Sequence, residues 1–79
     1  MATLSDLTQR EIQILHLVLE GQTNRAIAGE LSVCEKTVEF HLSHIYTKIG
    51  VRTRMLAGLW ALQQGIDLEK LGESLARFV

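Results

Sequence analysis

Three segments of this chain have helical periodicity, and a glycine closes each of them, at Gly21, Gly50 and Gly65. Glycine adopts the left-handed conformation that closes the last turn of a helix without steric cost, so these residues predict helix ends. The segments are too long for strands, and none shows sustained two-residue alternation. The chain has no proline, and its 79 residues suffice for one small domain only. We therefore predict an all-α domain of four or five helices.

The first helix has a clear start. Thr8 and Glu11 have the spacing of a capping box, in which each side chain bonds the backbone N–H of the other residue. The helix should end at Gly21. Its expected apolar face consists of Ile12, Leu15, Val18 and Leu19.

The later helices have similar boundaries. Thr23 and Thr53 are the expected N-caps of the second and fourth helices, and Asp67 is the expected N-cap of a short fifth helix. We expect one helical domain over residues 1–65 and an additional C-terminal helical segment over residues 66–79. The expected spans of the second to fifth helices are residues 23–31, 34–49, 53–64 and 67–78.

The second and third helices are joined by a short turn at residues 32–33, which is the arrangement of a helix-turn-helix. Ala28 lies at the expected crossing, where a larger side chain would push the two helices apart. Many helical hairpins share this pattern, so it indicates a fold rather than a function. The apolar positions expected to hold the third helix against its neighbours are Val38, Leu42, Ile45 and Ile49.

Composition and motifs exclude several classes of protein. The single cysteine, Cys34, allows no internal disulfide. The longest uncharged stretch is too short to span a bilayer, and the N-terminus lacks the layout of a signal peptide, so we expect no membrane contact and a cytoplasmic protein. Cys34, His41 and His44 could hold zinc only if they converged with a fourth ligand. No phosphate-binding loop or activated nucleophile appears, so we expect no catalytic residue, no metal and no cofactor.

Several short motifs recur in a characteristic order along the chain: LTQRE at 7–11, GQTNRAIA at 21–28, LSV at 31–33, TVEFH at 37–41, IYTKIGV at 45–51, and Arg54. Their order and spacing resemble the LuxR-type DNA-binding domain of bacterial transcriptional regulators. The resemblance covers about residues 6–65. It implies a four-helix domain whose third helix, about residues 34–49, enters the DNA major groove and whose fourth helix forms a dimer. Family members commonly carry an N-terminal receiver or ligand-sensing domain, which implies either a stand-alone regulator or an excised domain here.

The resemblance also implies roles for individual residues. Cys34 stands where the family usually has a serine cap, and a thiol is a weak acceptor, so we expect a softer start to the third helix and a small residue at a buried edge. The residues expected to face bases are Lys36, Glu39, Phe40 and Ser43. The residues expected to contact the DNA backbone are Thr23, Asn24, Arg25, Thr37, Lys48, Arg52 and Arg54.

The fourth helix reads MLAGLWAL over residues 55–62 and has no polar residue on any side. A helix that is apolar all round needs burial all round. One face, with Leu56, Leu59 or Trp60, can pack on the core of the domain. The other face needs a cover, either a second copy of the chain or residues 67–78 folding back, and the resemblance favours a homodimer. The expected dimer contacts are Met55, Leu59 and Leu62.

Glu39 departs from the family pattern, which usually has lysine at this position. A carboxylate repels phosphate, but it can accept a hydrogen bond from the exocyclic amine of cytosine. Glu39 therefore indicates an altered base preference, weakened DNA binding, or a solvated charge without a role. The whole chain has a net charge of −1, whereas residues 21–54 carry +2. We predict sequence-specific binding of duplex DNA and transcriptional regulation as a dimer; the alternative is a degenerate helix-turn-helix that acts as a protein-interaction module.

Overall fold

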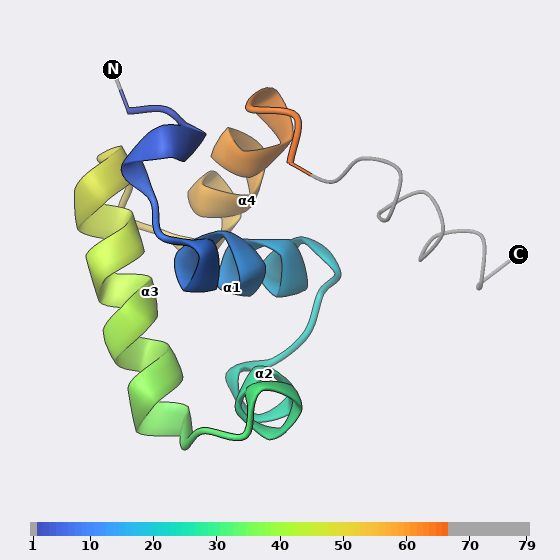
Figure 1. The fold of residues 1–79 in the computed structure, drawn as a ribbon. Coiled ribbons are helices and arrows are strands. Elements are labelled where there is room, and N and C mark those ends of the chain that lie inside the picture. The colour runs from blue at the N-terminus through green and yellow to red at the C-terminus, as the bar shows by residue number, and fades with distance from the viewer. Residues whose placement is uncertain (1, 67–79) are drawn as a thin grey trace, which may run out of the picture.

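The computed structural model describes residues 2–66, and this part of the chain is entirely helical (Figure 1). The all-α prediction is confirmed. The predicted fifth helix lies outside the described residues. Within residues 2–66, every helix is too short or too polar to cross a membrane. The elements are a 3-10 turn, η1 (Leu4–Asp6), and the helices α1 (Gln9–Leu19), α2 (Asn24–Leu31), α3 (Glu35–Ile49) and α4 (Arg54–Gln63).

The predicted helix starts are confirmed. At α1, Thr8 Oγ1 accepts a hydrogen bond from the Glu11 backbone N–H at 3.1 Å, and the Thr8 N–H donates to Glu11 Oε1 at 2.9 Å. Thr23 and Thr53 cap α2 and α4 in the same way, each with its hydroxyl oxygen 3.1 Å from a backbone nitrogen of the first turn. Cys34 is the N-cap of α3 and makes no side-chain capping bond, in agreement with the softer start expected there.

The predicted helix ends at three glycines are also confirmed. Gly21, Gly50 and Gly65 all have positive φ. The turn between α2 and α3 has the same conformation without glycine, because Ser32 adopts φ 57° and ψ 43°. The Val33 N–H then donates to the Ala28 carbonyl at 3.0 Å. This bond turns the chain tightly from α2 into α3.

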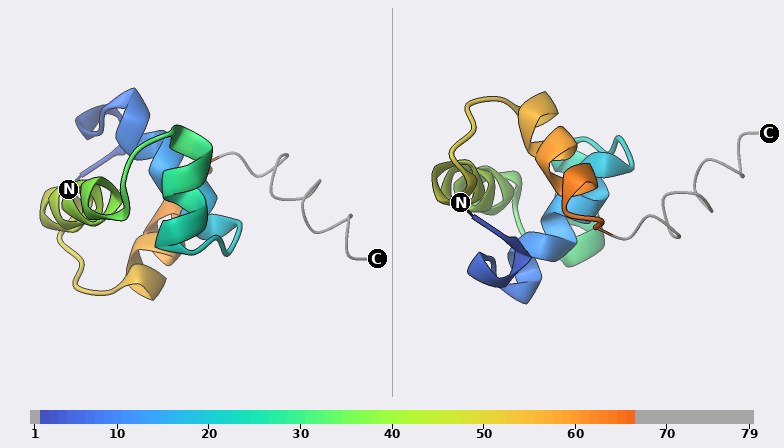
Figure 2. Two further views of the ribbon diagram at one scale, coloured as in Figure 1. Left: turned by 90° about the horizontal axis from the view of Figure 1, so that it is seen from below. Right: turned by 90° about the horizontal axis from the view of Figure 1, so that it is seen from above.

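Helix α1 lies at the centre of the fold, with α4 on one side of it and α2 on the other (Figure 1). Helix α3 packs against α1, α2 and α4. Both views in Figure 2 look nearly along α3, and the other three helices lie to one side of it. The largest fully buried side chains come from three helices: Ile14, Leu15, Ile27, Val38 and Ile45.

The predicted apolar face of α1 is only partly right. Leu15 is buried, but Ile14 and Leu17 are buried too, whereas the other three predicted residues are only partly buried. The reason is the central position of α1, which contacts α3 on one side and α4 on another. A helix covered on two sides buries a wider stripe than a surface helix does.

The prediction for α4, that Leu56, Leu59 or Trp60 packs on the core, is right for Trp60 and wrong for the two leucines. Ala57 and Ala61 are fully buried, whereas Leu56 and Leu59 are 43% and 51% exposed. Trp60 is half-buried against the core. Small side chains let α4 approach α1 closely, and the larger leucines are then left on the outer surface.

Candidate nucleic-acid interface

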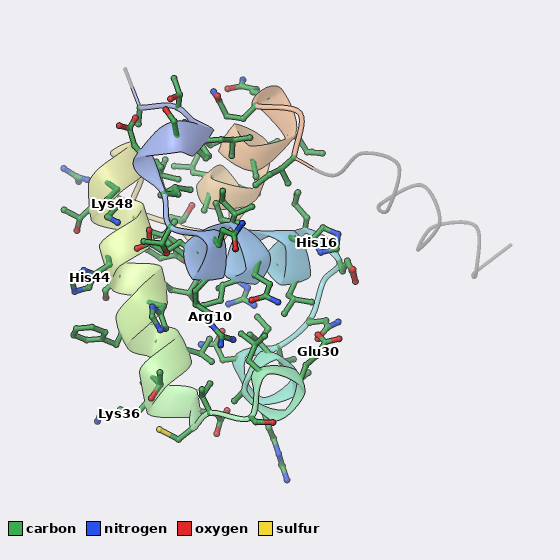
Figure 3. The ribbon with its side chains drawn as sticks, viewed as in Figure 1. Arg10, His16, Glu30, Lys36, His44 and Lys48 are labelled. Carbon is green, nitrogen blue, oxygen red and sulfur yellow. The ribbon has the colours of Figure 1, made fainter. Side chains whose placement is uncertain are left out.

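The outer side of α3 carries the four residues predicted to face bases. Lys36, Glu39, Phe40 and Ser43 recur at intervals of three, one and three residues, so they share one face of the helix. All four are exposed. Helix α3 is fixed by its opposite side, where Val38, Leu42 and Ile45 are buried in the core. In Figure 3, the labelled Lys36 and His44 lie along the side of α3 that faces away from α1, whereas the Lys48 ammonium contacts Glu11 of α1.

Phe40 is the most prominent apolar group on this face, with 62% of its surface exposed. Its ring lies against the His44 ring, with centroids 4.4 Å apart and planes at 42°. From the sequence, His44 was considered only as a metal ligand, and its contact with Phe40 was not predicted. The signal was the four-residue spacing, which places both rings on one side of a helix.

The start of α2 and the first turn of α3 hold several residues predicted to contact the DNA backbone. Thr23 and Arg25 are exposed, and Asn24 and Thr37 are half-buried. The Thr37 hydroxyl lies 3.2 Å from the Cys34 sulfur, and hydrogen bonds with Thr37 lower the pKa of that thiol. Cys34 is exposed, so the expectation of a buried edge position was wrong. As the N-cap, it precedes the first turn and stays outside the core.

Lys48, predicted to contact the DNA backbone, is already engaged within the protein. Its Nζ donates to Glu11 Oε1 at 2.7 Å, and the Glu11 side chain is almost completely buried. Burial raises the pKa of Glu11, but the hydrogen bonds from Lys48 and Thr8 and the charge of Lys48 outweigh this effect, so the pKa lies below its ordinary value of 4.5. Glu11 was predicted as part of the α1 cap, whereas its second role as the partner of Lys48 was not predicted.

Arg54 is engaged as well. Its Nη1 donates to Asn24 Oδ1 at 2.6 Å, and its Nη2 donates to the Gln22 carbonyl oxygen at 2.5 Å. The guanidinium therefore joins the start of α4 to the start of α2. Arg52, two residues earlier, is exposed. Arg52 and Arg54 were predicted to have the same role, but only Arg54 is held by hydrogen bonds that the structure shows within the protein.

The predicted dimer residues lie on the outer side of α4. Met55 is 72% exposed and Leu59 is 51% exposed, while Leu62 is half-buried. An open, mainly apolar groove runs along the same surface between α1 and α4. Its lining consists of Val18, Leu19, Arg54, Met55, Gly58, Leu59 and Leu62.

Among residues 2–66, no three side chains of His, Cys, Asp or Glu lie close enough together to hold a metal ion. The histidines have other neighbours. His44 contacts Phe40, and the His41 ring lies 6.4 Å from Phe40 in an edge-on arrangement. His16 is buried on α1, with Nε2 3.5 Å from the Glu20 carboxylate.

Comparisons with known proteins give a consistent result. Residues 5–61 match the family model for bacterial regulatory proteins of the luxR family. The chain is 40% identical over 60 residues to the nitrate/nitrite response regulator protein NarP of Escherichia coli (strain K12), a match that covers 76% of this chain and 28% of NarP. The crystal structure of the response regulator ChrA, from a heme-sensing two-component system, has a TM-score of 0.72 and 45% identity, covering 76% of this chain and 30% of ChrA.

The chain thus spans less than a third of the length of each of these relatives. The matched residues include helices α1 to α3 and most of α4. The family is one of transcription regulators rather than enzymes. The match extends over more than half of the chain, and its helices have the helix-turn-helix arrangement. The chain therefore belongs to the luxR family of bacterial regulatory proteins, and it contains the DNA-binding domain of that family.

Proposed function

We propose that this domain binds duplex DNA as a homodimer, places α3 in the major groove, and regulates transcription in the bacterial cytoplasm. The observation that carries this proposal is the exposed face of α3. A helix fits the major groove of B-DNA, where each base pair presents a distinct pattern of donors, acceptors and methyl groups. Helix α3 is anchored by its opposite face and leaves Lys36, Glu39, Phe40 and Ser43 accessible for such contacts.

These four side chains can read bases in different ways. Lys36 can donate to the acceptors of guanine, and Glu39 can accept from the amine of cytosine. Phe40 offers an exposed apolar surface to a thymine methyl group, and the His44 ring beside it limits the positions that the Phe40 ring can take. We propose that Glu39 alters base preference rather than preventing DNA binding.

Contacts with phosphates come from the start of α2 and from both ends of α3. Thr23, Asn24 and Thr37 supply neutral donors, and the first backbone N–H groups of α2 favour an anion at the start of that helix. Arg25 and Arg52 are exposed cations that can neutralise phosphates. Lys48 and Arg54 add positive charge nearby, although both already bind oxygen atoms of the protein.

The dimer is proposed to form through α4. Met55 and Leu59 are largely exposed beside an apolar groove, so a second copy would remove apolar surface from water. A two-fold dimer also matches the symmetry of an inverted-repeat DNA site. Leu62 lines the same groove and completes the proposed contact.

Salt dependence tests whether the domain binds DNA. With Arg25 and Arg52 of each protomer on phosphates, a dimer neutralises about four phosphates, so log affinity should fall with log salt concentration at a slope of about −4. Raising salt from about 50 to about 200 mM should then weaken binding about two hundredfold. Fluorescence anisotropy with a labelled duplex of mixed sequence measures both values.

The same titration separates the proposal from its alternative. A domain that acts only through protein contacts shows no saturable binding of duplex at either salt concentration. Sedimentation of the free protein in the same buffers measures dimer formation independently. Absence of DNA binding by a protein that does form dimers would favour the protein-interaction module.

A further inference from the structure

We propose that Arg54 is a positioning residue that fixes the orientation of the Asn24 side chain, so that the Asn24 amide nitrogen is presented to a DNA phosphate. Arg54 itself then contacts no phosphate. This inference rests on the proposed function, because it assigns a task within the same DNA-binding surface. It also replaces the role that sequence resemblance implies for Arg54.

The geometry shows how Arg54 is held. It is the first residue of α4, and it is half-buried. One terminal nitrogen donates to Asn24 Oδ1 at 2.6 Å, and the other donates to the Gln22 carbonyl oxygen at 2.5 Å. Both bonds are short, as is typical of hydrogen bonds from a charged donor. The guanidinium therefore holds the loop before α2 and the first residue of α2 at a fixed position relative to α4.

The chemistry of the guanidinium determines which way the Asn24 amide faces. Arginine has five N–H donors and no acceptor, so the branch of the amide that faces it must be the carbonyl oxygen. The Nδ2 group, which carries two donors, is then the branch that points away from Arg54. A phosphate only accepts hydrogen bonds, so it requires this orientation. With the amide reversed, Asn24 would present an oxygen to the negatively charged DNA backbone.

The place of Asn24 in the fold makes this orientation useful. Asn24 begins α2, directly after the N-cap Thr23. The first backbone N–H groups of a helix point outward from its start and favour an anion there. A correctly oriented Nδ2 group adds a side-chain donor to that set. Arg54 thus orients the Asn24 donor for a phosphate before DNA is bound.

Arg52 provides a matched control, because it is an exposed arginine only two residues away. We expect Arg54→Met to lower affinity for duplex DNA about tenfold, the loss typical of hydrogen bonds to a charged group, with the salt slope close to that of the wild type. Arg52→Met should instead make the slope shallower by about 2 per dimer, since one phosphate contact is lost on each protomer. Anisotropy titrations at several salt concentrations measure both variants.

Coupling to Asn24 gives a second readout. In a background that already carries Asn24→Ala, the Arg54→Met substitution should cause no further loss of affinity. All titrations are run at a temperature below the thermal midpoints of the variants, so that every variant is folded. If Arg54 only stabilised the fold, its replacement would then leave the affinity for DNA unchanged. If Arg54→Met does not fold, Arg54→Lys is used, because lysine keeps the charge but cannot bind Asn24 Oδ1 and the Gln22 carbonyl oxygen with a planar pair of donors. The same loss of DNA affinity is expected.

A measurement on the wild-type protein completes the test. The Nδ2 amide signals of Asn24 in a ¹⁵N NMR spectrum should shift when duplex DNA is added, and unchanged signals would contradict the inference. If Arg54→Met makes the salt slope shallower by as much as Arg52→Met does, Arg54 contacts phosphate. If the losses of affinity caused by Arg54→Met and Asn24→Ala are additive, the two residues act independently. Either result overturns the inference while leaving the proposed function in place. Absence of binding by the wild type would instead reject the proposed function and the inference with it.

Discussion

Replacing Glu11 with alanine is expected to lower the free energy of unfolding by about 3 kcal/mol, because this one carboxylate has two structural roles. It accepts the Thr8 N–H in the capping box of α1, and it pairs with Lys48 near the end of α3. Loss of the cap accounts for about 1 kcal/mol. The rest comes from a Lys48 ammonium left without its buried partner, an effect moderated because that side chain is 36% exposed. Chemical denaturation followed by circular dichroism measures the change.

The same carboxylate makes stability depend on pH. Its pKa in the folded protein is lowered, so its contribution is fully present above the pKa of the unfolded chain, near 4.5. That contribution is lost as pH falls through the lower, folded-state pKa. Glu11→Gln should therefore weaken the loss of stability in acid, because the substituted side chain does not titrate.

A double-mutant cycle separates the two roles of Glu11. Lys48→Met removes the ion pair and leaves the capping box in place. If the pair contributes as argued, the effects of Glu11→Ala and Lys48→Met should add to more than the effect of the double variant. Strict additivity would show that the Glu11–Lys48 contact adds nothing to stability.

Replacing Glu39 with lysine is expected to raise affinity for nonspecific duplex DNA about fiftyfold at about 0.1 M salt. The substitution removes a charge that repels phosphate and adds one contact per protomer, so the salt slope of a dimer should steepen by about 2. Glu39 is exposed on the outer face of α3, where a lysine would face the DNA in the proposed complex. Selectivity for a cytosine-containing site should fall at the same time, since the acceptor for the cytosine amine is lost.

Glu30→Lys is the matched control for this prediction. It makes the same change of charge at an exposed residue of α2, on the side of that helix away from α3 in Figure 3. Its effect on affinity should be much smaller, because at this ionic strength charges are screened over about 10 Å. Equal gains from the two variants would indicate a general effect of net charge rather than a contact at Glu39.

Features of the fold that depend on neighbouring residues could be predicted from sequence. The capping box of α1 involves residues three apart, and the left-handed glycines act within a single turn. The apolar stripe of α3 was also predicted correctly, because Val38, Leu42 and Ile45 pack on one side only. In each case the residues that produce the structural feature lie close to one another in the sequence.

Features that depend on which helices meet could not be predicted in this way. Helix α4 has alanines, leucines and a tryptophan on all sides, so its composition does not show that Ala57 and Ala61 would be the residues against α1. The partners of Lys48 and Arg54 lie 37 and 30 residues away along the chain. A single sequence shows that such charges exist but not which oxygen atoms the fold brings to them.

Contact between the outward face of α3 and DNA can be observed by a ¹⁵N NMR titration of the protein with duplex DNA. The largest changes in backbone amide signals should fall at Lys36, Glu39, Phe40 and Ser43, with further changes at the start of α2, and added salt should reverse them. Changes confined to α4, with the α3 signals unmoved at saturating DNA, would contradict this contact.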